Sequence, residues 1–237
     1  MIITLGSSNQ DIESKKSISL NFWVALFVFL QIAIVICGYT FKKAGVSNNF
    51  SLLYSKIITS SIMLSCSLFL LVKKGVSFSE RLAAYKKHAL HDLAVSLIVG
   101  GAVTLLAFLM TRFNMLGKVC SVNPVVLKTL LSGAGESLPH SGLALTLFNY
   151  CLLGPVMEEV FFRRLLYVSL RQRYSCLGSI MINSLIFGLI HPSAVLFIFL
   201  FGVIQCYVYE RFGRVSINIT SHVLYNSAVT AFSFPDI

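Results

Sequence analysis

Long apolar runs, each close to the length of a bilayer-spanning helix, limit how this chain can fold. A helix needs about 20 predominantly apolar residues to cross the hydrocarbon core of a membrane. Candidate runs lie at about 22–41, 51–72, 93–111, 142–170, 176–191, 195–210 and 215–233. Only 12% of the residues are charged, against about a quarter in soluble domains. The sequence therefore predicts an all-α polytopic membrane protein of about seven transmembrane helices, forming a single domain over residues 1–237.

The net charge of +10 would suggest nucleic acid binding in a soluble protein. Here the basic residues lie mostly between apolar runs, so membrane topology and anionic lipid headgroups explain them better, and we expect no nucleic acid partner. With seven spans, one side of the membrane receives Lys15, Lys16, Lys73, Lys74, Arg81, Lys86, Lys87, Arg171, Arg173, Arg211 and Arg214. The other side receives Lys42, Lys43, Lys56, Arg112, Lys118 and Lys128. This bias predicts a cytoplasmic N-terminus. We expect the chain to lie in the plasma membrane of a bacterium.

One apolar run contains two adjacent glutamates and two adjacent arginines, in the stretch GPVMEEVFFRRLLY. Ionisable side chains at the bilayer centre cost roughly 2.5–3.5 kcal/mol each, so they need a reason to be there. Glu159 and Arg163 are four residues apart and share a helix face, so we expect them to pair. Glu158 is turned away from Glu159 and points at something else. Gly154 and Pro155, just before them, predict a kink or a restarted helix.

Two later runs carry further polar faces at four-residue spacing. In NSLIFGLIH, Asn183, Phe187 and His191 share one face, and the proline after His191 ends the helix. In HVLYN, His222 and Asn226 share one face of the last run. Taken alone, each group also suits an ordinary structural role, either at the membrane interface or in helix–helix hydrogen bonding.

The three polar faces together suggest chemistry if they converge on an intramembrane polar cavity. A carboxylate or imidazole there can activate water, while a second imidazole and an amide stabilise an oxyanion, which is the equipment needed to hydrolyse a peptide bond. Faces that do not converge would favour a proton-coupled transporter instead. The segment KKHALHD, from Lys86 to Asp92, is interpreted as a solvated basic loop, and the six cysteines form no disulfide or zinc framework.

The ordered motifs resemble those of the CPBP family of intramembrane proteases, which includes the type II CAAX prenyl endopeptidases and bacterial Abi-type proteins. The family pattern EExxxR, FxxxH and HxxxN corresponds here to Glu158 through Arg163, Phe187 through His191, and His222 through Asn226. The resemblance covers about residues 142–232, which we take as the protease core. Arg164 departs from the pattern, because a glycine often follows the motif arginine.

The resemblance implies a role for each motif residue. Glu158 and His191 would activate water, His222 and Asn226 would form the oxyanion hole, and Glu159, Arg163 and Phe187 would support the site. The family has been described both as metal-dependent and as glutamate-dependent. In the first case Glu158, His191 and His222 would hold one divalent ion such as zinc.

The implied substrate is a membrane-associated peptide or protein. The alternative within the same fold is a non-catalytic scaffold or a bacteriocin-immunity protein. The motifs leave open the oligomeric state and whether the substrate is prenylated.

Overall fold

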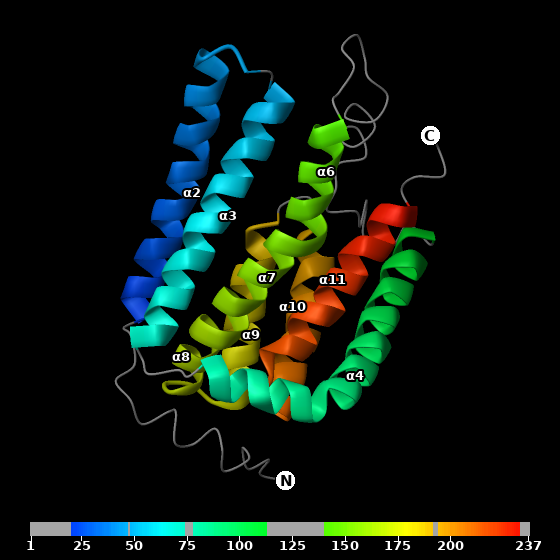
Figure 1. Ribbon diagram of the computed structural model, residues 1–237. Coiled ribbons are helices and arrows are strands. Elements are labelled where there is room, and N and C mark those ends of the chain that lie inside the picture. The colour runs from blue at the N-terminus through cyan, green and yellow to red at the C-terminus, as the bar shows by residue number, and fades with distance from the viewer. Residues whose placement is uncertain (1–19, 47, 74–77, 113–139, 192–193, 233–237) are drawn as a thin grey trace.

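The computed structural model describes residues 20–46, 48–73, 78–112, 140–191 and 194–232. These residues form seven helical rods (Figure 1), so the predicted all-α class and the predicted apolar runs are confirmed. Six of the rods are α2 (Leu20–Lys43), α3 (Asn48–Lys73), α4 (Phe78–Arg112), α9 (Cys176–Leu189), α10 (Val195–Phe212) and α11 (Val215–Phe232). The other extends from α6 (His140–Phe148) to α8 (Val168–Arg171). The segment NPVVLKTLLSG, residues 123–133, is short and amphipathic in sequence and is expected at the membrane interface, but it lies outside the described residues.

The distribution of side chains is that of a membrane protein. Among the described residues, four helical segments are long and apolar enough to cross a bilayer: Leu53–Lys73, Lys86–Met110, Ala144–Arg171 and Val195–Phe212. Large apolar side chains such as Phe29, Val35 and Ile98 are exposed on the outside of the bundle, whereas Glu159 and Arg163 are fully buried. Lipid, rather than water, suits such an outer surface, and the interior holds the polar groups.

The central rod is one continuous helix with two wide turns. A π-helical segment, η1 (Asn149–Leu153), precedes α7 (Gly154–Glu159), and a second, η2 (Val160–Tyr167), follows it. The predicted kink or restart at Gly154 and Pro155 is thus a π-helical turn, which widens the helix without breaking it. A side chain at position 154 would place its Cβ 2.9 Å from the carbonyl oxygen of Asn149, so glycine is required for this close approach.

The prediction of a solvated basic loop at Lys86–Asp92 is wrong, because these residues belong to α4. The first turns of α4 lie across one end of the bundle before the helix turns alongside α11 (Figure 1). Asp92 is buried and pairs with Arg214, with 2.7 Å between Oδ1 and a guanidinium nitrogen. This ion pair ties α4 to the turn between α10 and α11, where Gly213 adopts a left-handed φ of 66°.

The helices that carry the motifs pack closely against partners through small residues. Gly202 of α10 lies against Ser184 of α9, where an added Cβ would come within 3.1 Å of Ser184. Gly100 of α4 lies against α11, where an added Cβ would be 3.0 Å from the Ser221 carbonyl oxygen. Such contacts let helix backbones approach in a membrane, where packing replaces the hydrophobic effect. Helix α7 lies between α3 and α11, so its carboxylates face the middle of the bundle.

Candidate active site

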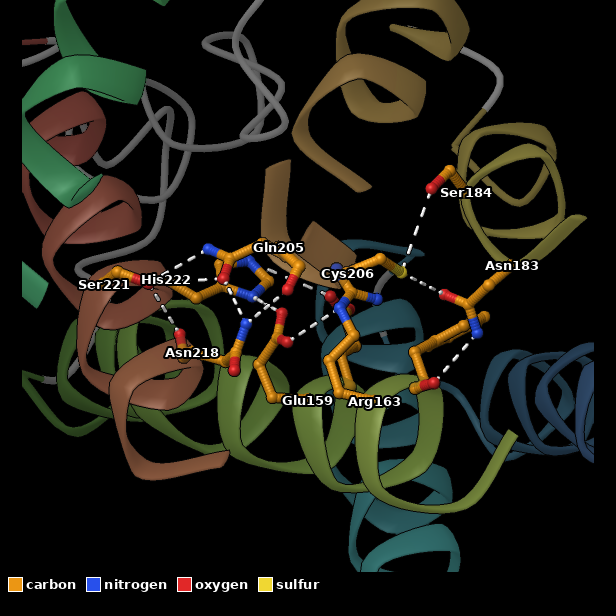
Figure 2. Close-up of polar contacts among 11 residues, drawn as sticks. Glu159, Arg163, Asn183, Ser184, Gln205, Cys206, Asn218, Ser221 and His222 are labelled. Carbon is orange, nitrogen blue, oxygen red and sulfur yellow. Dashed lines mark hydrogen bonds and ion pairs between the residues drawn. The ribbon is translucent and has the colours of Figure 1, made fainter. Parts of the chain in front are cut away.

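Glu159 forms the buried centre of the polar cluster (Figure 2). Its Oε2 lies 3.0 Å from Nε of Arg163, and both side chains are completely buried, so the predicted i,i+4 pair is confirmed. Its Oε1 accepts a hydrogen bond of 2.8 Å from Nδ1 of His222, a contact that sequence spacing does not predict. The Arg163 guanidinium also lies over the ring of Phe187, 4.7 Å from its centroid. Glu159 therefore joins the first motif to the third.

Glu158 lies between the two motif histidines. One carboxylate oxygen is 3.9 Å from Nε2 of His191, and the other is 3.9 Å from Nε2 of His222. These three residues come from α7, from the chain just beyond α9, and from α11. The three polar faces therefore converge. The arrangement that would have favoured a transporter, with the motifs on separate faces, is not the one observed.

Both imidazoles are held with Nε2 directed at Glu158. Nδ1 of His191 lies 2.8 Å from the Phe187 carbonyl oxygen, which can only accept a hydrogen bond, so Nδ1 carries the proton. The same argument applies to Nδ1 of His222 against the ionised Glu159 carboxylate. In each neutral ring, Nε2 is consequently left with a lone pair facing the Glu158 carboxylate.

A pocket of about 310 Å³ contains this cluster. Its walls come from α2, α3, the central rod, α9, α10 and α11, and they include Glu158, His191, His222 and Asn226. Glu158 is near the middle of the span Ala144–Arg171, so the pocket lies within the thickness of the membrane. The predicted intramembrane polar cavity is therefore present.

Asn226 contacts the central rod as well as the pocket. Its amide nitrogen donates a 2.8 Å hydrogen bond to the carbonyl oxygen of Tyr150. In a π-helical turn a carbonyl bonds the N–H five residues later, and Gly154 does so with Asn149. For Tyr150 the residue five places on is Pro155, which has no N–H. Asn226 thus supplies the missing donor with one N–H, and the amide carries a second.

Phe187 separates the imidazoles from the Arg163 side of the cluster. Its ring meets that of His191 edge-on, with centroids 5.0 Å apart, and that of His222 at 6.4 Å. Asn183 shares the helix face of Phe187 but does not line the pocket. Its amide instead donates to the Phe162 carbonyl oxygen at 2.8 Å, in the second π-helical segment. Arg164 is buried and donates to the Tyr209 hydroxyl at 3.1 Å.

A second polar network fixes the helix that carries His222 (Figure 2). The amide of Asn218 donates to the side-chain oxygen of Gln205 at 2.7 Å and to its backbone oxygen at 2.8 Å. The Gln205 amide donates to the Ser221 hydroxyl at 3.0 Å. All three side chains are fully buried between α10 and α11. Motif spacing does not reveal this network, although Asn218 and Ser221 precede His222 by only four residues and one residue.

The predicted metal ligands meet in the pocket but are not arranged as a metal centre. In the part of the chain that the structure describes, no group of three His, Cys, Asp or Glu side chains could hold a metal ion. Whether Glu158, His191 and His222 bind a divalent ion when it is supplied remains a prediction. Their chemistry suits zinc, and each Nδ1 already has the hydrogen-bond acceptor that zinc-binding histidines usually have.

Two further pocket residues, Lys56 and Tyr150, were not identified as site residues from the sequence. The topology prediction placed Lys56 among the charges outside the membrane, but it lies inside the span Leu53–Lys73 and lines the pocket. Its position within an apolar run was the signal that could have revealed it. Tyr150 has no comparable signal, because its role depends on the π-helical turn.

Comparisons with known proteins support the family resemblance. Residues 140–228 match the family described as "Type II CAAX prenyl endopeptidase Rce1-like", and the resemblance drawn from the motifs is confirmed over this stretch. The chain is 28% identical over 80 residues to "Putative membrane peptidase YdiL" of Bacillus subtilis (strain 168). That match covers 33% of this chain and 33% of the relative. No solved structure matches the chain significantly.

Proposed function

We propose that the protein is an intramembrane endopeptidase, and the match of residues 140–228 to the type II CAAX prenyl endopeptidase Rce1-like family supports this proposal. It hydrolyses a peptide bond of a membrane-associated peptide or protein. The observation that carries the proposal is the Glu158 carboxylate, which faces Nε2 of two imidazoles at 3.9 Å each within one membrane-embedded pocket. A carboxylate beside an imidazole nitrogen with a lone pair, here Nε2 of His191, is suited to take a proton from water.

Glu158 acts as the general base, assisted by His191. Separations of 3.9 Å are too long for direct hydrogen bonds, and one water can bridge such groups. As the water oxygen bonds to the substrate carbonyl carbon, its proton passes to Glu158, and Nε2 of His191 accepts a hydrogen bond from the second O–H. Glu158 then gives its proton to the amide nitrogen as the carbon–nitrogen bond breaks. Every proton is accounted for within the site.

His222 and Asn226 stabilise the negative charge that develops on the carbonyl oxygen. His222 would donate to that oxygen from Nε2 as an imidazolium, while its Nδ1 stays on the Glu159 carboxylate at 2.8 Å. Asn226 contributes the N–H that is not directed at Tyr150. Donors aimed at a developing oxyanion act most strongly in the transition state, which is where they accelerate the reaction.

A non-catalytic scaffold or bacteriocin-immunity protein of the same fold is the alternative, and Glu158 distinguishes the two functions. The test uses the purified protein in lipid vesicles with membrane-anchored peptides, and mass spectrometry detects the products. Glu158→Gln should lower turnover by about 10²–10⁴ with an unchanged melting temperature, since a general base contributes that much. Glu80→Gln is the matched control, because Glu80 belongs to the first turn of α4 and to none of the three motifs. Equal cleavage by both variants would contradict the proposal.

We further propose that the protein lies in a bacterial plasma membrane with its N-terminus in the cytoplasm. The end of α3, the start of α4 and the ends of α8 and α10 lie at one end of the bundle (Figure 1). That end carries Lys73, Lys86, Arg171, Arg211 and Arg214. Such a concentration of Lys and Arg supports a cytoplasmic location for this end.

A further inference from the structure

Lys56 places a positive charge in the wall of the pocket. It lies one helical turn inside the candidate span Leu53–Lys73 and lines the same cavity as Glu158. It is the only lysine or arginine among the described residues that line this cavity. An ammonium group within a membrane span is costly, and such groups usually face a cavity and pair with an anion.

The contacts of Lys56 hold its ammonium without neutralising it. Nζ donates to the Tyr150 hydroxyl over 3.4 Å and lies 5.3 Å from the centroid of the same ring. An aromatic face offsets part of the cost of a desolvated cation, though less than a carboxylate does. Among the described residues, no carboxylate forms an ion pair with Lys56. An ammonium group has three donors, and this geometry uses one of them.

The pocket therefore has two oppositely charged parts. Glu158 lies between the histidines in one part, and Lys56 lies against Tyr150 in the other. Tyr150 also connects Lys56 to the proposed oxyanion donor, because its backbone carbonyl oxygen accepts the hydrogen bond from Asn226. An anionic group entering the pocket would be attracted by Lys56 and repelled by Glu158, and low polarity strengthens both effects.

We propose that Lys56 binds a carboxylate of the substrate and so selects peptides that carry a carboxylate close to the cleaved bond. This inference rests on the proposed peptidase function and adds a substrate class to it. The carboxylate is either the C-terminus of the peptide or an Asp or Glu side chain, since both present the same two oxygens to an ammonium group. Binding at Lys56 fixes which bond of the peptide lies against Glu158.

The test compares N-palmitoylated apolar hexapeptides that differ only in charge. One ends in a free carboxylate, the second in a carboxamide, and the third in a carboxamide with one internal Asp. The kcat and KM for each are measured in vesicles for wild type, Lys56→Gln and Lys56→Arg. Lys73→Gln is the matched control, because Lys73 lies near an aromatic ring of the same helix, 5.1 Å from the Phe69 centroid, but outside the pocket.

For wild type, we expect a KM roughly 10–100-fold lower for the preferred carboxylate peptide than for the carboxamide, the range for a hydrogen bond to a charged group. Lys56→Gln should remove this preference, so that the KM values of the three peptides become equal. Lys56→Arg should keep much of the preference, and Lys73→Gln should keep all of it. The peptide that shows the preference identifies the source of the carboxylate.

Discrimination that is the same in wild type and Lys56→Gln would overturn the inference. If Lys56→Gln lowers the melting temperature but keeps the preference for the carboxylate peptide, the contact of Lys56 with Tyr150 is purely structural and the inference is likewise overturned. The carboxylate preference can also be measured as binding, without catalysis. Binding of the same three peptides to Glu158→Gln gives their Kd ratios without turnover, with and without Lys56→Gln. If wild type cleaves no peptide but the carboxylate preference in binding depends on Lys56, the proposed peptidase function fails, whereas the binding of a carboxylate by Lys56 stands.

Discussion

The Glu159 carboxylate accepts the Nδ1–H of His222 at 2.8 Å while its second oxygen lies 3.0 Å from Nε of Arg163. One buried carboxylate therefore neutralises a guanidinium on its own helix and orients an imidazole on α11. A residue with both contacts affects stability and chemistry together. Helical spacing predicts only the contact of Glu159 with Arg163.

We expect Glu159→Gln to reduce both the melting temperature and kcat. The substitution leaves Arg163 buried without a counter-charge, which typically costs about 3–5 kcal/mol. It also weakens the hydrogen bond that orients the His222 ring, and losing such a supporting contact typically lowers activity about 10–100-fold. Thermal unfolding and single-turnover cleavage of a membrane-anchored peptide measure the two effects.

The double variant Glu159→Gln/Arg163→Gln separates the two roles of Glu159. Removing both charges should recover part of the lost stability, because no buried charge is left unpaired. It should not recover kcat, since His222 still lacks its anionic partner. Recovery of both quantities would show that Glu159 has only a structural role.

Residue spacing predicts contacts within one helix, because the helical period controls them. It does not predict contacts between helices, because these depend on three-dimensional packing. The Glu159–Arg163 pair and the end of α9 before Pro192 follow from residues within one or two turns. The Glu159–His222 contact joins residues 63 positions apart and depends on how α7 packs against α11. The convergence of three polar faces was a conditional expectation, because periodicity cannot orient one helix relative to another.

The loop predicted at Lys86–Asp92 is wrong for a physical reason. Hydropathy treated these residues as a loop, but helix formation depends on local propensity and tertiary contacts as well as on apolar length. Their helix is anchored by the Asp92–Arg214 ion pair, whose carboxylate is buried, and no local pattern contains this contact. Lys56 lies one turn inside a span, where a cavity and an aromatic ring accommodate it, and counting charges for topology does not reveal that environment.

Metal removal tests how the water is activated. The Glu158 carboxylate lies 3.9 Å from Nε2 of each histidine, a separation that one water can bridge, so we expect turnover to persist after dialysis against a strong chelator. The measurement compares kcat before and after dialysis, with the metal content determined by mass spectrometry. Loss of activity that returns with added Zn²⁺ would instead make Glu158, His191 and His222 its ligands, as the family resemblance allows.

Cysteine labelling tests the orientation of the chain. Ser79 is in the first turn of α4, at the end of the bundle that carries most of the basic residues. In an otherwise cysteine-free protein in intact bacterial cells, we expect Ser79→Cys to resist a membrane-impermeant thiol reagent. Ala44→Cys, at the exposed turn between α2 and α3, should react readily. The opposite labelling pattern would invert the topology.

Asn226 gives the last prediction, because its structural and chemical roles can be measured separately. Its amide supplies the Tyr150 carbonyl oxygen with the hydrogen bond that Pro155 cannot provide. Asn226→Ala should therefore lower the melting temperature, since losing such a hydrogen bond typically costs about 0.5–1.5 kcal/mol. It should also reduce kcat by about 10²–10³, the usual effect of losing an oxyanion donor.

Adding Pro155→Ala to Asn226→Ala separates these two effects. The new backbone N–H at position 155 is five residues after Tyr150, so it can donate to the Tyr150 carbonyl oxygen within the π-helical turn. We expect the melting temperature to recover while kcat stays low, because no donor returns to the substrate oxygen. Pro155→Ala alone is the control and should remain active. A double variant that regains kcat together with stability would restrict Asn226 to holding α11 against the central rod, and the oxyanion would then depend on His222 alone.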